Sequence, residues 1–291
     1  MKKTYLLAGT AILFWSTMAT VSKLLLGTMD QYQVLCISGL LAGFALFAVN
    51  LVTGRLALLK QYRGKDLLIM IGTGLLGNFF YYVCYYGGAA RMPASQAFIV
   101  NYLWPIMSVV FACILLKEKL TPRKILAIAL SFLGIFAVAG ADLLSFDVDI
   151  LTGAALCALG AVFYGAFTAL NKKWNYDMHI AMMLSFFAAS LLSLPLALVS
   201  GASWALNGFQ WAGLAWNGLC TMAVANTCWV LAINRGSTVK VSNLAYITPF
   251  LSLVWIFLFL REPFSLWSVV GLCIIVLGIL IQLREKTKTS A

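Results

Sequence analysis

The stretch NYLWPIMSVVFACILLKEKLTPRKILAIALSFLGI, residues 101–135, is repeated later in the chain in altered form. Adding 144 to each number gives AYITPFLSLVWIFLFLREPFSLWSVVGLCIIVLGI, residues 245–279. The matched pairs include Tyr102 with Tyr246, Pro105 with Pro249, Ser108 with Ser252, and Glu118 with Glu262. Each copy also places a proline inside a strongly apolar run. The repeat therefore indicates two structurally related halves, each with an irregularity in one helix.

The composition of the chain requires a bilayer. The chain has 291 residues, of which 63% are hydrophobic and 10% charged, whereas a soluble domain carries about 25% charged residues. A membrane-crossing helix needs about 20 mostly apolar residues. The uncharged runs predict an all-α integral membrane protein with ten transmembrane helices, over residues 5–26, 34–52, 67–90, 92–116, 124–141, 150–171, 178–234 (two helices, divided at 200–209), 241–260 and 265–283.

The same offset covers nearly the whole chain and predicts its division into two parts. It also aligns Gly9 with Gly153 and Gly74 with Gly218. We expect a first five-helix repeat over residues 1–145 and a second over residues 146–291. Because five is odd, the second copy enters the membrane from the opposite side. Inverted repeats around a central cavity are typical of secondary transporters.

The distribution of positive charge predicts the orientation. The net charge is +11, but with ten spans nearly all Lys and Arg residues fall on the side of the N-terminus, and cytoplasmic loops carry such an excess. We therefore expect a multi-pass protein of the cell (inner or plasma) membrane with both termini cytoplasmic, and a lipid partner rather than nucleic acid. The residues on the cytoplasmic side are Lys2, Lys3, Arg55, Lys60, Arg63, Lys65, Lys117, Lys119, Arg123, Lys124, Lys172, Lys173, Arg235, Lys240, Arg284, Lys286 and Lys288.

The paired prolines predict hinges. Pro105 and Pro249 lie near the middle of the fourth and ninth predicted spans. Proline lacks an N–H group and clashes with the carbonyl four residues earlier, so the carbonyls of Asn101 and Ala245 are expected to lose their helical partners. Two kinks at equal depth favour a hinge and a cavity wall. The alternative is that membrane helices tolerate proline generally.

These features together resemble one family. The paired five-helix repeats, FWS at 14–16 with Lys23 near the end of the first helix, the pattern PxxSxxxxxxxxxE at 105–118 and 249–262, and a closing LGI in each copy resemble the EamA family. This family belongs to the drug/metabolite transporter superfamily, and the resemblance covers residues 5–140 and 150–283. It implies export, or sometimes uptake, of small metabolites through a central cavity by alternating access. One departure is CISGL at 36–40, where many members carry an arginine.

Aromatic and amide residues gather unevenly inside the spans, and we interpret a subset as the cavity wall. The competing interpretation is that they form aromatic belts at the membrane interface or pack against neighbouring helices. Intramembrane polar residues tend to mark substrate paths. The predicted substrate-binding residues are Trp15, Asn78, Tyr82, Asn101, Tyr102, Trp104, Tyr164, Asn226, Trp229 and Tyr246.

The predicted hinge or gating residues are Pro105, Pro249, Lys23, Glu118 and Glu262. For Lys23, two interpretations are open: its ammonium extends to the outer interface, or it pairs with a substrate carboxylate. Glu118 and Glu262 lie beside lysine and arginine residues, so local ion pairs are the alternative to a gating role.

No acid lies in the middle of a predicted span, which disfavours a proton-coupled multidrug or organic-cation exporter. We therefore predict a carrier for a small neutral or zwitterionic metabolite, in particular an aromatic amino acid or related compound, working in the export direction. A non-transporting scaffold is a second alternative. An enzyme is not predicted, because paired acids, histidine clusters and metal motifs are missing. No cofactor and no metal are expected, and the pattern makes no prediction of oligomeric state.

Overall fold

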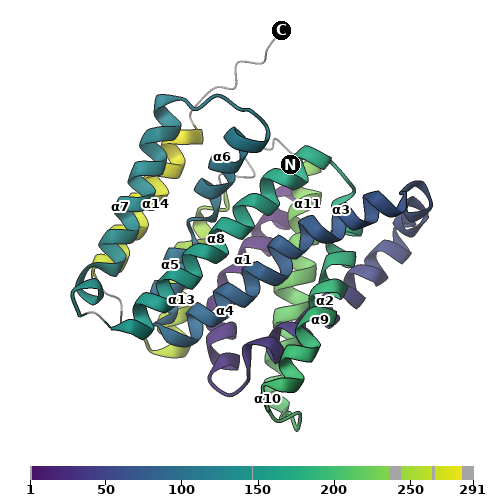
Figure 1. The fold of residues 1–291 in the computed structure, drawn as a ribbon, viewed down its shortest axis with the longest axis horizontal. Helices are drawn as coiled ribbons and strands as arrows, with labels where there is room; N and C mark the ends of the chain where they lie inside the picture. The colour runs from purple at the N-terminus through teal and green to yellow at the C-terminus, as the bar shows by residue number, and fades with distance from the viewer. Residues whose placement is uncertain (1, 146, 236–243, 264–265, 284–291) are drawn as a thin grey trace.

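The computed structural model describes residues 2–145, 147–235, 244–263 and 266–283, and this part of the chain is helical and contains no β-strand. The helices pack side by side in one bundle (Figure 1). Lys240, Arg284, Lys286 and Lys288, which the sequence assigns to the cytoplasmic side, lie outside the described residues. The prediction of an all-α chain is confirmed for the described part.

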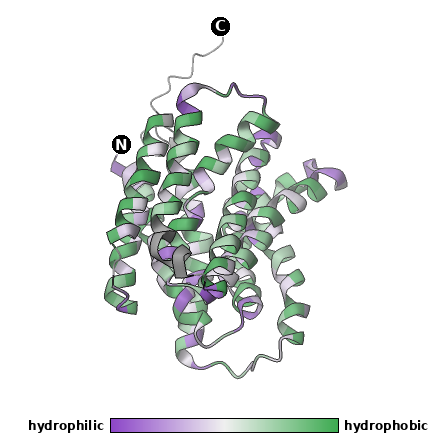
Figure 2. Ribbon diagram, turned by 60° about the vertical axis from the view of Figure 1, so that its left-hand side comes forward, coloured by the Kyte–Doolittle hydropathy of each residue, from purple (hydrophilic) through white to green (hydrophobic). Residues whose placement is uncertain are grey.

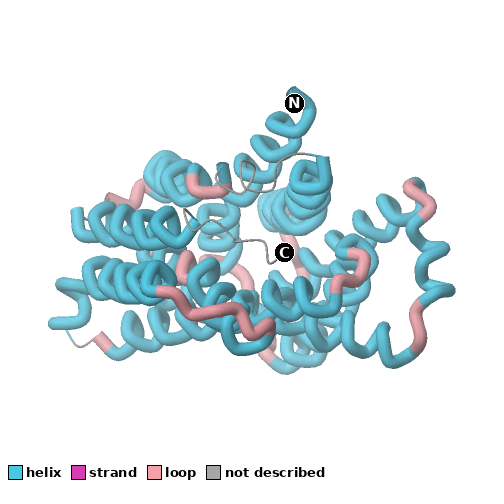
Figure 3. The backbone as a smooth tube through the Cα atoms, turned by 90° about the horizontal axis from the view of Figure 1, so that it is seen from above, coloured by secondary structure: helices cyan, strands magenta, loops and turns pink. Residues whose placement is uncertain are grey.

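The elements of the first half are α1 (Lys2–Leu26), α2 (Gln31–Val52), the 3₁₀ helix η1 (Arg55–Gln61), α3 (Gly64–Leu75), the π-helix η2 (Leu76–Phe80), α4 (Tyr81–Arg91), α5 (Ala94–Asn101), α6 (Trp104–Leu115) and α7 (Pro122–Ser145). Those of the second half are α8 (Val148–Trp174), α9 (Met178–Val199), α10 (Gly208–Ala215), the π-helix η3 (Trp216–Val224), α11 (Ala225–Arg235), α13 (Ile247–Trp255), the π-helix η4 (Ile256–Leu260) and α14 (Leu266–Leu283). Loops join them, as the view from above shows (Figure 3).

Several helical stretches have the length and composition of membrane spans. Six stretches in the described residues are long and apolar enough to cross a bilayer: Lys2–Leu26, Gln31–Val52, Gly64–Arg91, Ala94–Leu115, Val148–Trp174 and Met178–Val199. Two shorter apolar helices cover Ile247–Leu260 and Leu266–Ile281.

Most residues of the helices are hydrophobic, as the hydropathy colouring shows (Figure 2), and many of their large apolar side chains are exposed on the outside of the bundle. Phe44, Phe136, Leu191 and Phe259 are each more than 60% exposed, although they are side chains that a water-soluble protein buries. Exposed apolar surface of this extent marks contact with another apolar phase. The bundle therefore has the surface of a protein that is surrounded by lipid.

Aspartates fix where three of the long helices begin. Asp30, Asp147 and Asp177 precede α2, α8 and α9, and each side chain accepts hydrogen bonds from the N–H groups two and three residues later. Such caps satisfy backbone donors that have no partner inside the helix. The helices therefore begin at these caps, up to a few residues before the uncharged runs from which the spans were predicted.

Helices at matched positions of the two halves pack against each other. The helix α7 lies along α14, and α2 lies along α9 (Figure 1). At the α7–α14 crossing, a Cβ on Gly134 would lie 2.7 Å from the Gly271 carbonyl oxygen, and a Cβ on Gly278 would lie 2.9 Å from the Ala127 carbonyl oxygen. These two glycines, Gly134 and Gly278, are matched by the repeat. Each lets the backbone of its partner helix approach closely, which is the common use of small residues between membrane helices.

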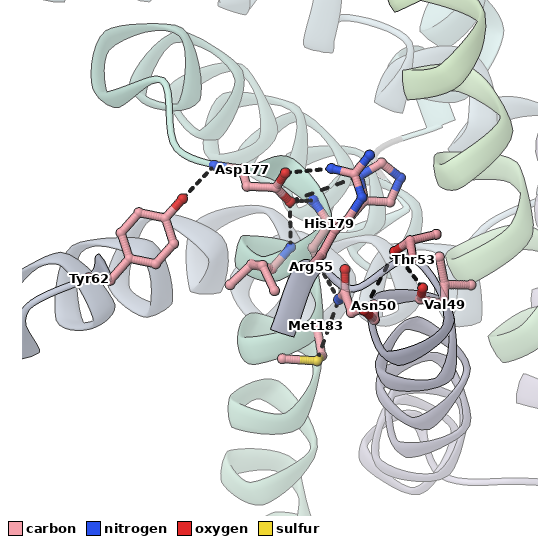
Figure 4. Close-up of polar contacts among 9 residues, drawn as sticks. Val49, Asn50, Thr53, Arg55, Tyr62, Asp177, His179 and Met183 are labelled. Carbon is pink, nitrogen blue, oxygen red and sulfur yellow. Dashed lines mark hydrogen bonds and ion pairs between the residues drawn. The ribbon is translucent and has the colours of Figure 1, made fainter. Parts of the chain in front are cut away.

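A polar cluster joins the halves where α2 ends and α9 begins (Figure 4). Arg55 Nη1 donates to Asp177 Oδ2 at 2.6 Å, while Asp177 Oδ1 accepts from the backbone N–H groups of His179 and Ile180 at 3.0 and 3.1 Å. The buried Asn50 amide donates to the His179 carbonyl oxygen at 3.2 Å. The same carboxylate thus caps α9 and holds the loop that follows α2.

Candidate functional site

A cavity of about 250 Å³ lies between helices of both halves. Nine of the ten predicted substrate-binding residues line it; Tyr246 does not, and packs instead against the apolar cluster around Leu253 and Leu272. The full lining is Trp15, Met18, Asn78, Tyr81, Tyr82, Phe98, Asn101, Tyr102, Trp104, Tyr164, Phe167, Thr168, Asn171, Met178, Met182, Asn226, Trp229, Val230, Ala245 and Thr248.

Aromatic rings form two parts of the wall. In one part, the Tyr164 ring contacts Trp104 edge-on, with centroids 5.1 Å apart and planes at 76°, and lies 4.8 Å from Tyr81. In the second part, Trp15 of α1 and Trp229 of α11 lie 5.2 Å apart. Aromatic pairs of this geometry are favourable and rigid, so the wall offers preformed apolar surfaces from both halves of the chain.

The sequence pattern on α8 extends further than predicted. Tyr164, Phe167, Thr168 and Asn171 are spaced by three or four residues and all line the cavity. Residues at this spacing share one face of a helix. Of these four, the sequence analysis identified only Tyr164, although the spacing of the polar residues that follow it contained the signal for Thr168 and Asn171.

Two π-helical segments occur at matched positions near the cavity. Adding 144 to the range of η2 gives residues 220–224, which fall within η3. Single turns of π-helix are rare and frequently occur at functional sites. Asn78 lies within η2 and donates from Nδ2 to Ser185 Oγ at 2.6 Å, and Asn226, just after η3, donates to the Met222 carbonyl oxygen at 2.6 Å. The NH₂ group of each amide therefore donates to an acceptor within the protein.

The helices with the matched prolines are interrupted. The helix α5 ends at Asn101 and α6 begins at Trp104, directly before Pro105; α13 begins two residues before Pro249. The Ala245 carbonyl has no helical partner at Pro249, as expected, but it is not left unpaired. Its oxygen accepts hydrogen bonds from Thr248 N at 3.0 Å and from Tyr102 OH at 3.1 Å. The second of these bonds links the broken helix of one half to that of the other.

None of the described residues that line the cavity carries a charged side chain. Amide, hydroxyl and aromatic groups supply its polarity. Such a lining binds through hydrogen bonds and ring contacts, because burying an unpaired charge in a site of this kind is costly.

The cavity reaches one end of the bundle. Asn171 lies three residues before the end of α8, and Met178 is the first residue of α9. The beginning of α8 lies at the other end, where Gly88 of α4 packs against Gly153 and Cys157. At 1.5 Å per residue, Gly153 and Asn171 are separated by about 27 Å along the helix. The end of α4 therefore lies far from the end of the bundle that the cavity reaches.

At the end of α4, side chains tie several elements together. We call this set the Lys23–Glu262 network; it consists of Lys23, Ala89, Met92, Ala94, Ser95 and Glu262. Lys23 Nζ donates to the carbonyl oxygens of Ala89 at 2.6 Å and Met92 at 2.8 Å. Glu262 accepts from the backbone N–H groups of Ala94 at 3.0 Å and Ser95 at 3.2 Å. A carboxylate at these first N–H groups of α5 is stabilised by the positive end of the helix dipole.

For Glu262, these contacts differ from the local ion pair considered in the sequence analysis. Glu262 binds the start of α5, 168 residues away in sequence. Its counterpart Glu118 pairs with Lys124 at 3.1 Å and with the more distant Lys172 at 2.9 Å. The hydrogen bond from Lys172, and then that from Lys124, hold the pKa of Glu118 below its ordinary value. The two repeats thus use their matched glutamates differently.

The backbone explains why these glutamates point away from their own helices. Lys117 and Arg261, the residues directly before them, both have φ of 56°. This left-handed conformation is uncommon for residues other than glycine and ends a helix sharply. The following carboxylate is therefore directed toward another helix, and helical spacing alone does not predict its partner.

Known proteins resemble this chain over nearly its whole length. A model of the EamA-like transporter family matches residues 2–140 and 151–284. An uncharacterized transporter of Clostridium kluyveri is 26% identical, over 100% of this chain and 96% of that protein. The aromatic amino acid exporter YddG of Ancylobacter novellus is 24% identical over 85% of each chain.

Two further matches extend this comparison. A probable terminal-alkyne amino-acid exporter of Streptantibioticus cattleyicolor is 26% identical over 88% of this chain and 86% of that protein. One solved crystal structure shares the fold, with a TM-score of 0.69 and 22% identity, and covers 97% of this chain and 96% of that one.

Proposed function

The chain belongs to the EamA-like transporter family and is a multi-pass membrane protein, and from this premise we propose that it is a secondary carrier for a small neutral or zwitterionic metabolite. The cargo is an amino acid with an aromatic or comparable apolar side chain, moved in the export direction by alternating access. The observation that carries this proposal is the cavity, which combines aromatic walls and amide groups with a lining free of charged side chains among the described residues.

Ring contacts support an aromatic or apolar cargo. Two pairs of packed rings, Trp104 with Tyr164 and Trp15 with Trp229, line the cavity with rigid apolar surface. A flat ring gains about 0.5–1.5 kcal/mol per aromatic contact beyond the burial of its surface. Two relatives named as exporters of amino acids support the same cargo class.

Packing between matched helices supports ten spans arranged as two inverted repeats, over residues 1–145 and 146–291. In an inverted repeat, equivalent helices meet at the axis that relates the halves, as α7 with α14 and α2 with α9 do here. One half then rocks against the other around the cavity, and the helix interruptions at Pro105 and Pro249 serve as hinges. The Lys23–Glu262 network serves as the gate that closes the outer end.

The side chains that line the cavity disfavour a proton-coupled exporter of organic cations. Such a carrier needs a carboxylate that proton and cation share, and the described lining residues include none. The transport cycle proposed here therefore runs by facilitated diffusion or exchange, without covalent chemistry.

Counterflow in proteoliposomes tests this function. Vesicles that contain the purified protein and unlabelled phenylalanine should transiently accumulate labelled phenylalanine with no imposed pH gradient, because an exchanging carrier moves label inward as unlabelled substrate leaves. Protein-free vesicles are the control. A strict requirement for a proton gradient would contradict the uncoupled cycle. Absence of counterflow with phenylalanine and with other apolar amino acids would contradict the cargo class.

Labelling of single cysteines tests the orientation. In a background in which the seven native cysteines are replaced, Asp149→Cys should react with an impermeant maleimide on intact cells, and Arg63→Cys only after permeabilisation. Asp149 is preferable to its neighbour Asp147, which caps α8. The reverse pattern of labelling would place both termini outside the cell.

A further inference from the structure

Three buried polar atoms of the cavity wall have no hydrogen-bond partner among the described residues. They are Asn101 Oδ1, Thr248 Oγ1 and Asn171 Nδ2. Asn101 is 3% exposed and Thr248 is 6% exposed. Leaving such a group unpaired costs about 1–3 kcal/mol. In a wall that faces a cavity, a bound molecule is the natural source of the missing partners.

Four other polar side chains of the wall donate hydrogen bonds within the protein. Asn78 donates to Ser185, Asn226 to the Met222 carbonyl, Tyr102 to the Ala245 carbonyl, and Thr168 to the Tyr164 carbonyl at 2.8 Å. The Asn101 Nδ2 atom is also occupied, because it donates to Tyr81 OH at 3.0 Å. The Asn101 side chain therefore presents its carbonyl oxygen, which only accepts hydrogen bonds.

Asn101 and Thr248 belong to one region of the cavity. Asn101 is the last residue of α5, and Thr248 lies directly before Pro249 in α13. The Tyr102–Ala245 hydrogen bond, 3.1 Å long, joins these two interruptions. The aromatic wall is close by, since Asn101 binds Tyr81, whose ring lies 4.8 Å from that of Tyr164.

Asn171 lies at a different depth in the cavity from Asn101 and Thr248. It lies seven residues beyond Tyr164 on the same face of α8, which corresponds to about 10 Å along the helix. This distance is several times the separation between the amino and carboxyl groups of an amino acid. One bound amino acid therefore does not place the same head group at Asn101 and Asn171, and Asn171 contacts cargo nearer the mouth of the cavity.

We propose that Asn101 and Thr248 determine specificity by binding the primary amine of the cargo. This assignment rests on the proposed transport of amino acids. An ammonium group carries three donors and no acceptor, so it matches the Asn101 carbonyl oxygen and the Thr248 hydroxyl oxygen. Nearby tyrosine rings add favourable contact with a cation. A zwitterion brings its own negative charge, which explains how the amine is bound without an acidic side chain in the described wall.

Competition with head-group analogues tests the assignment. Counterflow of labelled phenylalanine is measured with unlabelled N-acetylphenylalanine, in which the amine is blocked, or phenylalaninamide, in which the carboxylate is blocked. We expect N-acetylphenylalanine to compete at least about tenfold more weakly than phenylalanine, which corresponds to about 1.4 kcal/mol. The assay is run at about pH 8.5, above the usual α-amino pKa of about 7.7–8.0, so that most of the phenylalaninamide is uncharged. It then keeps its N–H donors without bringing an unpaired charge into the cavity, and it should stay within a few-fold of phenylalanine.

Variants connect this preference to the two residues. Thr248→Val keeps the shape of the side chain and removes its hydroxyl, so the difference between the two analogues should shrink; Thr248→Ser should restore it. Asn101→Leu should also reduce the difference. Thr168→Val is the matched control, because the Thr168 hydroxyl is occupied by the Tyr164 carbonyl, and the preference should persist. Monodisperse elution of each purified variant establishes that it is folded.

The outcomes separate the two proposals. Phenylalanine counterflow with equal competition by both analogues would overturn the amine assignment and leave the transport function standing. If phenylalaninamide competes more weakly than N-acetylphenylalanine, Asn101 presents its NH₂ group to the cargo. This result would also overturn the amine assignment. Absence of counterflow with any amino acid would contradict the proposed cargo class, and the amine assignment with it.

Discussion

Replacing Trp104 with alanine should lower the counterflow rate of phenylalanine at subsaturating concentration by at least about tenfold, the effect of about 1.4 kcal/mol. The Trp104 ring packs edge-on against Tyr164 at 5.1 Å and lies 6.5 Å from Tyr102. Its removal takes away a ring contact with the cargo and the neighbour that holds Tyr164 in place. Both losses weaken the apolar binding surface.

Two comparisons make this result specific to the cavity. Trp104→Phe keeps an aromatic face and should retain part of the rate. Trp267→Ala removes a tryptophan that is 57% exposed on α14, away from the lining, and should leave the rate close to that of the unchanged protein. Equal rates for Trp104→Ala and Trp267→Ala would remove Trp104 from the binding site.

Helices and much of the cavity wall could be predicted from the sequence, because both depend on local patterns. Apolar runs of sufficient length predict helices in a membrane protein, and the repeat offset pairs equivalent positions of the two halves by residue number alone. Asn78 and Trp229 were identified because polar or aromatic residues inside apolar runs are conspicuous. Thr168 and Asn171 were missed only because the spacing from Tyr164 was not followed to the end of α8.

Partners across long sequence separations could not be predicted. Asn78 binds Ser185, and Glu262 binds the start of α5; both contacts depend on how helices cross. For Glu262 the left-handed backbone of Arg261 also turns the side chain away from its neighbours. The alternative that Glu262 forms an ion pair with a neighbouring lysine or arginine was therefore wrong. Likewise, the hydroxyl of Tyr102 that replaces the helical partner of the Ala245 carbonyl comes from the other half of the chain, and the proline alone does not predict it.

If the Lys23–Glu262 network is the gate of the proposed carrier, replacing Glu262 with glutamine should open that end of the bundle. The carboxylate caps two N–H groups of α5 from the other half of the chain, at 3.0 and 3.2 Å. Hydrogen bonds to a charged group contribute about 1.5–3 kcal/mol. Their loss should shift the equilibrium between closed and open forms by about tenfold or more, and transport should slow because the closed form is less populated.

Spin labels at exposed positions report this change. Arg91→Cys and Arg261→Cys lie at the ends of α4 and η4 beside the network, and both residues are exposed. In a background without other cysteines, the distance between the two labels should have a short component that Glu262→Gln converts to a longer one. Glu118→Gln is the matched control, since Glu118 pairs with Lys124 and Lys172 toward the opposite end. It should not lengthen the distance. If Glu262→Gln leaves the distance distribution unchanged, the carboxylate caps α5 without gating the cavity, and closure of this end must depend on Lys23 and on apolar packing.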